Sequence, residues 1–574
     1  MHIRKKMIVT LATCLCVSLV AVACSSDKNN GSESATATKS DNGAKASDKP
    51  ISSSSSEKDT AFAKYDTPIE LTTVRSLGDN LKFAQGEDLD HNIWTKDMLE
   101  QLGIKIKNNW SVARAQYDAK LNVTIASNDL PDFFYVNAIQ LKQLAEAGQI
   151  IDLKGLVDKY GSPIVKQFAQ DTRNGLASAT FDGKLMGLAA GGSTLDQAPM
   201  VWIRKDWLTK LNLSVPKTMD DLIKISDAFT SKDPDGNGKP DTYGLALQKN
   251  LYGGFGSLDG YFNGYHAYPK MWVKGKDGNL VYGSIQPEMK TALAKLQELY
   301  KNGQIDKEFG VKDSNKEGEL VASGKIGMTF GQMPISLSQL GDNRKNDPKA
   351  DWQAYPIVSV DSNPAMAQIP AIGVSMEDPS YLVVSKSNKH PEAAIKLLNL
   401  VVKYLNDPST SNDVWTAHSK ANGNEVWMYP PVSAGQPEKN LKVHQDVVAA
   451  LDKKDPSGLN AEENDAYNHS VKAAQGQGDV ADWGFDKVFG REGSYATINQ
   501  YVKNNLLMPS EFYGTPTQTM GDKFTTLQKS ELETFTKIIM GASIDSFDKF
   551  VSDWKSLGGD QITKEVNDWA KSKK

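Results

Sequence analysis

Cysteine is almost absent from this sequence. The 574 residues contain three cysteines, Cys14, Cys16 and Cys24, and none lies beyond residue 24. A disulfide framework, a cysteine-ligated zinc or iron–sulfur site and a cysteine nucleophile are therefore excluded from the bulk of the chain. Any role of cysteine is therefore confined to the first 24 residues.

The sequence also lacks an excess of basic residues and a long apolar run after its N-terminal segment. It has 65 Lys and Arg against 70 Asp and Glu, a formal net charge of −5. A nucleic-acid binder would show a basic stripe, so we expect no nucleic-acid partner. No apolar run beyond residue 23 reaches the roughly 18 residues that a membrane-spanning helix needs.

Catalytic signatures are missing as well. None of the seven histidines lies in an HExxH motif, and neither a GxSxG elbow nor a GxxxxGK[ST] phosphate loop occurs. A glycosidase needs two carboxylates across a cleft, and no pair stands out among the acidic residues. We predict that the protein is not an enzyme, with a secreted polysaccharide-degrading enzyme as the alternative.

The N-terminus carries an export signal. A basic cluster at 4–6 precedes the uncharged, mostly apolar run 7–23, which is the order of regions in a signal peptide. The segment 21–24 reads AVAC and resembles a bacterial lipobox, which predicts cleavage after residue 23 and lipidation, including palmitate, on Cys24. A plain membrane-spanning anchor is the alternative, although the run is short for it.

Residues 24–66 form the next segment, and its stretch 25–59 is rich in Ser, Lys, Asp and Gly, with Ile51 as the only large apolar residue of that stretch. Such a composition cannot bury enough surface to offset the entropy of ordering. We therefore expect a flexible tether between the lipidated cysteine and a folded body, with the lipid anchor as the only membrane contact. The body would lie on the extracellular face of the cell membrane.

Strand and helix patterns alternate at the start of the body. Residues 69–74 predict a strand, 93–102 a helix, 104–106 a second strand and 130–137 a third. This alternation is typical of parallel βαβ units in an α/β fold. Ligands of such sheets bind at the carboxyl ends of the strands, so the loops that follow the first and third strands are candidate binding loops.

An Asp-rich loop follows near residue 233. Its oxygen donors fall at positions 1, 3, 5, 7 and 9 of a twelve-residue calcium frame with glycine at position 6. The predicted ligands are Asp233, Asp235, Asn237, the Lys239 carbonyl and Asp241. Position 12 is Gly244 instead of glutamate, so a sixth ligand would come from water, Thr242 or elsewhere. We predict a structural Ca²⁺; a metal-free turn is the alternative.

These features together resemble a known family. The lipobox, the tether, WIRKDWLTKLNLSVPKTMDDL at 202–222, DPDGNGKPDTYGL at 233–245, GKIGMTF at 324–330 and YLVVSK at 381–386 are similar to extracellular solute-binding proteins, family 1, of ABC importers. The match is to the large lipoprotein branch of Gram-positive bacteria, similar to alginate- and oligosaccharide-binding members. In related alginate-binding members the Asp-rich loop binds calcium, which supports the same ligands here.

The resemblance implies a two-lobe α/β fold of the type II periplasmic-binding-protein kind, with the ligand between the lobes. One lobe would comprise 67–197 plus 375–435, and the other 198–374 plus 436–574. The hinge would include 191–193 and a crossing near 369–374. The glycine pair at 191–192 independently suits a hinge, because glycine tolerates large changes in φ and ψ.

Sugar sites combine aromatic platforms with planar hydrogen-bonding side chains. Candidates on the first lobe are Arg75, Asp79, Asn80 and Asn137. Candidates on the second are Tyr252, Phe255, Tyr261, Phe262 and Tyr265, in a Gly-rich aromatic stretch. Trp272, Gln332, Trp415, Trp427 and Tyr429 are further candidates. The alternative for each aromatic residue is a place in the core.

The resulting hypothesis is a monomeric, lipid-anchored binding protein that captures an oligosaccharide by lobe closure. The closed form would dock on ABC permease subunits that a separate ATPase powers. The same fold binding a peptide or another small solute is the alternative.

Overall fold

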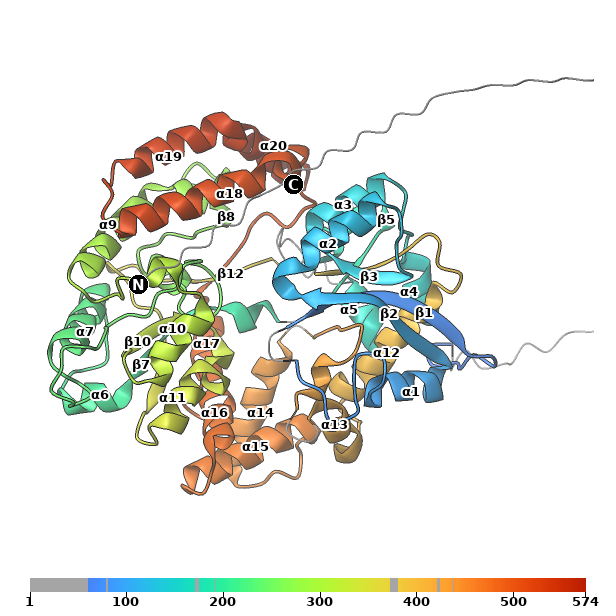
Figure 1. The fold of residues 1–574 in the computed structure, drawn as a ribbon, viewed down its shortest axis with the longest axis horizontal. Coiled ribbons are helices and arrows are strands. Elements are labelled where there is room, and N and C mark those ends of the chain that lie inside the picture. Colours follow the sequence, from blue (N-terminus) through green and yellow to red (C-terminus); the bar gives the residue numbers. More distant parts are fainter. Residues whose placement is uncertain are drawn as a thin grey trace, which may run out of the picture. The chain divides into compact units, whose positions relative to one another are not determined.

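The computed structural model describes residues 60–78, 81–170, 175–190, 193–371, 380–420, 424–436 and 438–573 (Figure 1). These residues all belong to one compact unit. Cys24, Asp79, Asn80, Gly191 and Gly192 lie outside the described residues, as do the predicted signal peptide and nearly all of the predicted tether. Within the described ranges, no helix is both long and apolar enough to cross a membrane.

The body begins with the parallel βαβ unit that the sequence pattern predicts. Strand β1 (Ile69–Leu77) pairs in parallel with β2 (Ile104–Ala113), and helix α1 (Ile93–Leu102) connects them. Asn92 caps the start of α1 by accepting hydrogen bonds from the backbone of Trp94 and Thr95. Gly103 ends the helix in the left-handed region, with φ 69°. This part of the predicted α/β pattern is confirmed, and the Asn92 cap and the left-handed Gly103 explain where the helix begins and ends.

The third strand departs from the parallel expectation. β3 (Phe133–Val136) pairs antiparallel with β13 (Tyr381–Val384), which also pairs with β6 (Leu188–Ala189). The fully buried β13 comes from a segment roughly 250 residues downstream in the chain, so local sequence gives no signal of the pairing. Asp132 joins the two sheets, because its carboxylate accepts hydrogen bonds from the Thr72 amide and hydroxyl, at 2.8 and 2.7 Å.

These strands share one hydrophobic core with a set of helices. The core is supplied by residues within 71–188 and 381–432. We call the elements that share it the first lobe. Its further elements are α2 (Arg114–Ala126), α3 (Ala138–Glu146), α4 (Lys154–Tyr160), α5 (Pro163–Gln170), β4 (Thr180–Phe181), β5 (Lys184–Leu185), α12 (Glu392–Asn406), α13 (Asn412–Ser419) and η6 (Val426–Met428).

A second antiparallel sheet lies elsewhere in the unit. Its central strand β7 (Met200–Arg204) pairs with β10 (Met328–Gly331) and β11 (Trp352–Tyr355), and every residue of β7 is buried. Trp202 and Trp207 are core residues, as the strand–helix pattern at this point predicts. A short parallel pair, β12 (Ala367–Ile369) with β14 (Leu507–Pro509), follows.

Two further cores surround these strands, supplied by residues within 195–369 and 441–566. We call the elements that share them the second lobe. Besides those named, the elements are η2 (Thr194–Gln197), α6 (Lys205–Lys210), α7 (Met219–Ser231), α8 (Asp259–Gly264), β8 (Trp272–Lys274), β9 (Leu280–Tyr282), η3 (Gly283–Ile285), α9 (Pro287–Lys301), η4 (Phe309–Val311), α10 (Ser314–Ala322), η5 (Met333–Leu337), α11 (Gln339–Asn346), α14 (Lys439–Lys453), α15 (Ala461–Ala474), α16 (Val480–Phe489), α17 (Ser494–Lys503), α18 (Gln518–Ile539), α19 (Ser546–Trp554), η7 (Lys555–Gly559) and α20 (Asp560–Ser572).

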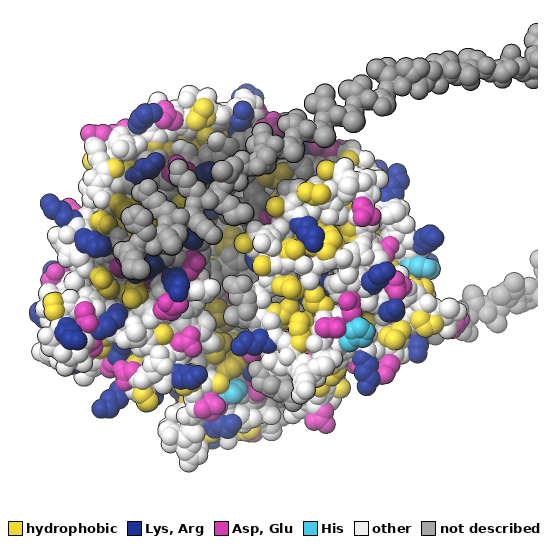
Figure 2. All heavy atoms as spheres, in the orientation of Figure 1, with side chains coloured by type: hydrophobic (Ala, Val, Ile, Leu, Met, Phe, Trp, Pro, Cys, Tyr) yellow, Lys and Arg dark blue, Asp and Glu magenta, His cyan; other side chains and the backbone are white. Residues whose placement is uncertain are grey.

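The chain passes between the lobes more than once, because each lobe draws on separated stretches of sequence. Ile369, at the predicted crossing, lies in a core of the second lobe. The numerical lobe boundaries stay a prediction. On the face shown in Figure 2, acidic and basic side chains are intermixed over the surface, as the small net charge leads one to expect.

Candidate functional site

The carboxyl ends of β1 and β3 meet at one segment of the first lobe. Arg75, near the end of β1, donates from Nη1 to the Tyr429 carbonyl at 2.9 Å and from Nη2 to the Met428 carbonyl at 3.2 Å. Tyr135, near the end of β3, donates its hydroxyl to the Ser433 carbonyl at 3.1 Å and accepts from the Ser433 amide at 2.8 Å. Segment 428–433 thus bridges the two predicted binding loops.

Burial lowers the pKa of Arg75 to about 10, so the guanidinium stays charged at neutral pH. It therefore places a positive charge at these strand ends. Tyr117 adds a further hydroxyl, which donates to the Tyr135 carbonyl at 2.9 Å. The strand ends of the first lobe consequently combine a cation, phenol groups and backbone carbonyls within one small region.

An exposed indole stands directly before this segment. Trp427, in η6, is 52% exposed, and its Nε1 donates to Glu425 Oε2 at 2.6 Å. That hydrogen bond fixes the edge of the ring and leaves aromatic surface open to solvent. Tyr429 behaves differently: it is buried against Phe83, with ring centroids 4.7 Å apart, and its hydroxyl donates to the Lys82 carbonyl. Of these two predicted aromatic candidates, Trp427 can form a platform, whereas Tyr429 is core.

Asn137 has a structural role in this arrangement. Its side chain accepts from the Gln140 amide at 2.9 Å, and Gln140 Oε1 accepts from the Asn137 amide at 3.0 Å. This reciprocal pair is a capping box at the start of α3, and Asn137 is 7% exposed. The prediction that Asn137 contacts ligand is therefore corrected: its amide oxygen is already used. An Asn followed three residues later by Gln is a capping signal that the sequence itself displays.

The Gly-rich aromatic stretch of the second lobe is mostly core. Phe255, Tyr261 and Phe262 are 3%, 0% and 0% exposed, and Tyr265 is also buried. The glycines allow close packing: a Cβ at Gly260 would lie 2.5 Å from Phe330, and one at Gly264 would lie 2.5 Å from Met219. The density of Gly and aromatic residues that suggested a binding loop therefore reflects tight packing, which corrects Phe255 and Tyr261 as ligand contacts. Trp272, at 4% exposed, is core too.

Tyr252 is the half-buried member of this stretch. Its hydroxyl donates to Glu531 Oε1 at 2.7 Å, and the Lys270 ammonium lies 5.6 Å from its ring centroid. Glu531 also accepts from the hydroxyls of Ser284 and Tyr282, at 2.9 and 3.1 Å. Burial raises the pKa of Glu531, and these donors act against that rise.

A hydrogen-bonded network of carboxylate and amide side chains adjoins Tyr252. Asp259 accepts from the Gly253 amide at 2.7 Å and from Gln368 Nε2 at 3.3 Å, and burial raises its pKa. Gln368, in β12, accepts from Asn263 Nδ2 at 2.8 Å. Reasoning from the sequence missed Asp259, Gln368 and Glu531. No local signal could have found Gln368 or Glu531, because both lie more than 100 residues from their partners along the chain.

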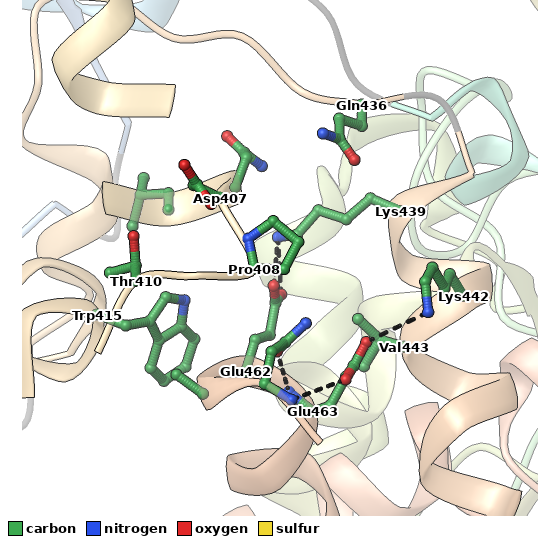
Figure 3. A pocket seen from close by; sticks show the side chains of 14 residues that line it. Asp407, Pro408, Thr410, Trp415, Gln436, Lys439, Lys442, Val443, Glu462 and Glu463 are labelled. Carbon is green, nitrogen blue, oxygen red and sulfur yellow. Dashed lines mark hydrogen bonds and ion pairs between the residues drawn. The ribbon is translucent and has the colours of Figure 1, made fainter. Parts of the chain in front are cut away.

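Trp415 lines a small pocket where the two lobes meet (Figure 3). Asp407, Pro408 and Thr410 line it from the first lobe, and Gln436, Lys439 and Glu462 line it across from them. Lys439 and Glu462 form an ion pair at 2.7 Å. The pocket volume of about 100 Å³ is below the roughly 300 Å³ at which ligand pockets usually begin. Trp415 is therefore in a side pocket suited to a small group or water in this conformation.

Gln332, the remaining candidate, is half-buried between β10 and η5. The structure brings Arg75 and Trp427 together through segment 427–429, and it keeps Tyr252 on the second lobe. Asp79 and Asn80 follow β1 directly but lie outside the described residues.

The Asp-rich loop folds as a compact turn. Asp233 has φ 49°, and its carboxylate accepts from the amides of Gly236, Asn237 and Gly238, each at 3.0 Å. Asn237 Nδ2 lies 2.7 Å from Asp235 Oδ2 and 3.1 Å from Asp241 Oδ1. Asp235 and Asp241 thus both lie within hydrogen-bond reach of Asn237, and hard oxygen donors of this kind fit Ca²⁺. Thr242 does not fit as a sixth ligand, because its buried hydroxyl donates to the Phe229 carbonyl at 2.7 Å.

In the described residues, however, the loop carboxylates do not form a ready cluster of three metal-binding side chains. Two nitrogen donors stand between them: Asn237 Nδ2 and the Lys325 ammonium, which lies 2.6 Å from Asp241 Oδ2 and 3.6 Å from Asp235 Oδ2. The oxygen donors of the loop fit calcium chemically. In this structure, the Lys325 ammonium pairs with two of the loop carboxylates.

The comparison with protein families decides the identity of the fold. Residues 91–403 match the model of the bacterial extracellular solute-binding protein family. The chain belongs to this family. The resemblance stated from the sequence is thereby confirmed, together with the type II periplasmic-binding-protein-like fold class.

Individual relatives agree with this assignment. The chain is 27% identical to lipoprotein LipO of Bacillus subtilis over 485 residues, covering 83% of this chain and 89% of LipO. It is 32% identical over 225 residues to the polygalacturonan/rhamnogalacturonan-binding protein YtcQ of Bacillus subtilis, covering 39% of this chain and 43% of YtcQ. The structure of an EF-hand mutant of FusA from S. pneumoniae, a substrate-binding protein in complex with fructo-nystose, has a TM-score of 0.61 at 20% identity and covers 88% of this chain and 100% of FusA.

Family membership also bears on the enzyme alternative. The family is one of extracellular solute-binding proteins, and YtcQ and FusA are named as binding proteins, which fits a binding role for this family member.

Proposed function

We propose that the protein is the lipid-anchored substrate-binding component of an ABC importer and that it captures an oligosaccharide. The observation that carries the proposal is the exposed indole of Trp427, which directly precedes the segment that the charged Arg75 guanidinium holds at the strand ends of the first lobe. Sugars offer apolar C–H faces to such rings and hydroxyl edges to such donors. The names of YtcQ and FusA, which bind carbohydrates, support the ligand class.

Binding would begin at the first lobe and be completed by the second. Trp427 covers one face of a sugar ring, and Arg75 provides positive charge for hydroxyl or carboxylate oxygens. The half-buried polar groups of the second lobe, Tyr252 and Gln332, supply contacts when the lobes approach. Closure is favoured only by those contacts that the closed state adds, so a ligand that reaches both lobes shifts the population toward it.

Ligand identity is tested by thermal melting with a panel of oligosaccharides, including fructo- and galacturono-oligosaccharides. A saturable rise in the melting temperature without release of reducing ends supports a carbohydrate-binding protein. Release of reducing ends would instead identify an enzyme. Stabilisation by peptides alone would favour the alternative ligand class.

We further propose that Cys24 carries the lipid and that the folded body lies outside the membrane. The lipoprotein LipO is a relative over most of the chain, which supports an anchor of this kind. The test is expression in a Gram-positive host: Cys24→Ser is expected to shift the protein from the membrane fraction to the medium. Mass spectrometry of the N-terminal peptide checks for acyl chains such as palmitate, and light scattering checks the expected monomer.

Calcium is the last part of the proposal. Asp233, Asp235, Asn237, Asp241 and the Lys239 carbonyl would hold the ion, with water completing its shell. When bound, the ion would neutralise the carboxylates and pin the loop between α7 and the strand-like segment near Tyr243. The FusA structure named for an EF-hand mutant supports such a loop in the family. Melting in chelator and in excess calcium tests it, since a structural ion raises the melting temperature.

A further inference from the structure

A basic side chain from another part of the chain reaches the carboxylates of the Asp-rich loop. The Lys325 ammonium lies 2.6 Å from Asp241 Oδ2 and 3.6 Å from Asp235 Oδ2. The side chains of these three residues are 22% to 38% exposed, so the ion pairs are partly withdrawn from solvent. Both carboxylates are among the predicted calcium ligands.

The backbone holds Lys325 in this place. It follows Gly324, which ends α10 with φ 75°, and its amide donates to the Leu320 carbonyl at 2.9 Å. The Lys325 carbonyl accepts from the Tyr243 amide at 2.8 Å, and Gly327 donates to the Tyr243 carbonyl at 3.1 Å. Backbone hydrogen bonds therefore join the turn after α10 to the end of the Asp-rich loop. This places the Lys325 ammonium beside the carboxylates of Asp235 and Asp241.

A second lysine contacts the loop without entering the carboxylate cluster. Lys210, at the end of α6, donates to the Pro234 carbonyl at 2.8 Å. This contact fixes the start of the loop, whereas Lys325 contacts the acidic groups themselves. A cation bound to the carboxylates would therefore compete with Lys325 for their oxygens but not with Lys210.

An ammonium and Ca²⁺ cannot share these oxygens at low cost. Calcium binds oxygen ligands at roughly 2.3–2.6 Å and needs six or more of them. Lys325 makes its closest contact with Asp241 Oδ2, one of those ligands. A cation at the centre of the loop would face the ammonium at short range, and like charges repel.

We infer that Lys325 is a built-in cation of the Asp-rich loop, which stabilises the loop without metal and must move aside when calcium binds. The inference rests on the proposed calcium site. It predicts that calcium affinity is set by this exchange and is weaker than the same oxygen donors would give without the lysine.

The test compares wild type with Lys325→Met, using calcium chloride as the only added metal. Isothermal titration in metal-free buffer should show at least a tenfold tighter calcium affinity for K325M. Melting in chelator should occur at a lower temperature for K325M than for wild type, and calcium should raise its melting temperature by more. Lys325→Arg keeps the charge, and its calcium affinity should stay near that of wild type.

Lys316→Met is the matched control, because Lys316 is an exposed lysine on the preceding helix α10 whose ammonium pairs with Glu319. It removes one positive charge from the helix that precedes Lys325 without touching the loop, so its calcium affinity should be close to wild type. Equal tightening in K316M and K325M would overturn the inference in favour of a general charge effect.

The outcomes separate the two proposals. If wild type binds calcium and K325M binds it equally or more weakly, the calcium site stands and the role of Lys325 is wrong. If neither K325M nor wild type binds calcium, the calcium proposal fails and the exchange fails with it. Circular dichroism confirms that K325M is folded, and Lys325→Gln, which also removes the charge, carries the test should K325M not fold.

Discussion

Replacing Trp427 by alanine is the sharpest test of the candidate site. Trp427 is 52% exposed, and its neighbours on the same segment are held by Arg75 and Tyr135. Because an aromatic side chain buries up to ~250 Å², about 130 Å² of Trp427 is open, and a sugar ring stacked on one face would cover roughly half of that area. At ~25 cal/mol per Å², the stacked area is worth ~1.6 kcal/mol.

This energy corresponds to a rise in Kd of about 15-fold for Trp427→Ala. Isothermal titration with whichever oligosaccharide stabilises the wild type measures the change. The melting temperature without ligand should fall little, because half of the side chain is already in water. Trp427→Phe should recover part of the affinity, since it keeps an aromatic face.

Val311→Ala provides the control, because Val311 is a 78% exposed apolar residue on η4 of the second lobe. Its Kd should match wild type. A Kd for W427A within twofold of wild type would show that the indole is not a platform, and the site at the strand ends would then lose its main support.

Three further predictions concern the framework of the site. Asn399→Ala should lower the free energy of unfolding by ~3 kcal/mol in urea denaturation, because the buried Asn399 amide bonds the Ala61 and Tyr160 carbonyls and the Ser162 amide. Asn406→Ala, at the half-buried end of the same helix, is the control, and a loss below ~1 kcal/mol for Asn399→Ala would contradict the argument. Burial raises the pKa of Glu317 from 4.5 to about 7, so the stability that it contributes is full below pH 4.5 and is lost as the pH rises through 7. Over that window the loss is up to ~3 kcal/mol, and Glu317→Gln should flatten the curve of unfolding free energy against pH; an unchanged slope would refute it. Gly260→Ala should cost ~1–3 kcal/mol because its Cβ would meet Phe330 at 2.5 Å, whereas Gly458→Ala, with open space around it, should melt like wild type in calorimetry.

Local patterns in the sequence predicted local structure well. The alternation at 69–106 became a parallel βαβ unit, with Asn92 and Gly103 as its cap and terminator. The buried character of Trp202 and Trp207 followed from their strand–helix context. These features depend on residues a few positions apart, whose periodicity and capping chemistry the sequence displays directly.

Contacts between segments that are distant along the chain could not be predicted from the sequence. The antiparallel pairing of β3 with β13 and the bond between Tyr252 and Glu531 join residues separated by roughly 250 positions or more. The aromatic stretch at 251–268 was interpreted as a binding loop, and this interpretation was wrong for most of its aromatic residues for a related reason. Glycine next to aromatic residues suits both an open binding loop and a tightly packed core, and only the tertiary neighbours Phe330 and Met219 decide between them.

The candidate site shows the same division within a few residues. Residue type and strand order were enough to propose Arg75, and aromatic character was enough to propose both Trp427 and Tyr429. Their places depend on contacts some 350 positions away along the chain: Arg75 bonds the backbone carbonyls of residues 428 and 429. Tyr429 packs on Phe83 and is core, whereas Trp427, two residues earlier, is left open to solvent. Arg75 bonds the backbone carbonyls of residues 428 and 429 and leaves the Trp427 ring open to solvent, which is why a substitution at Trp427 should alter ligand affinity much more than stability.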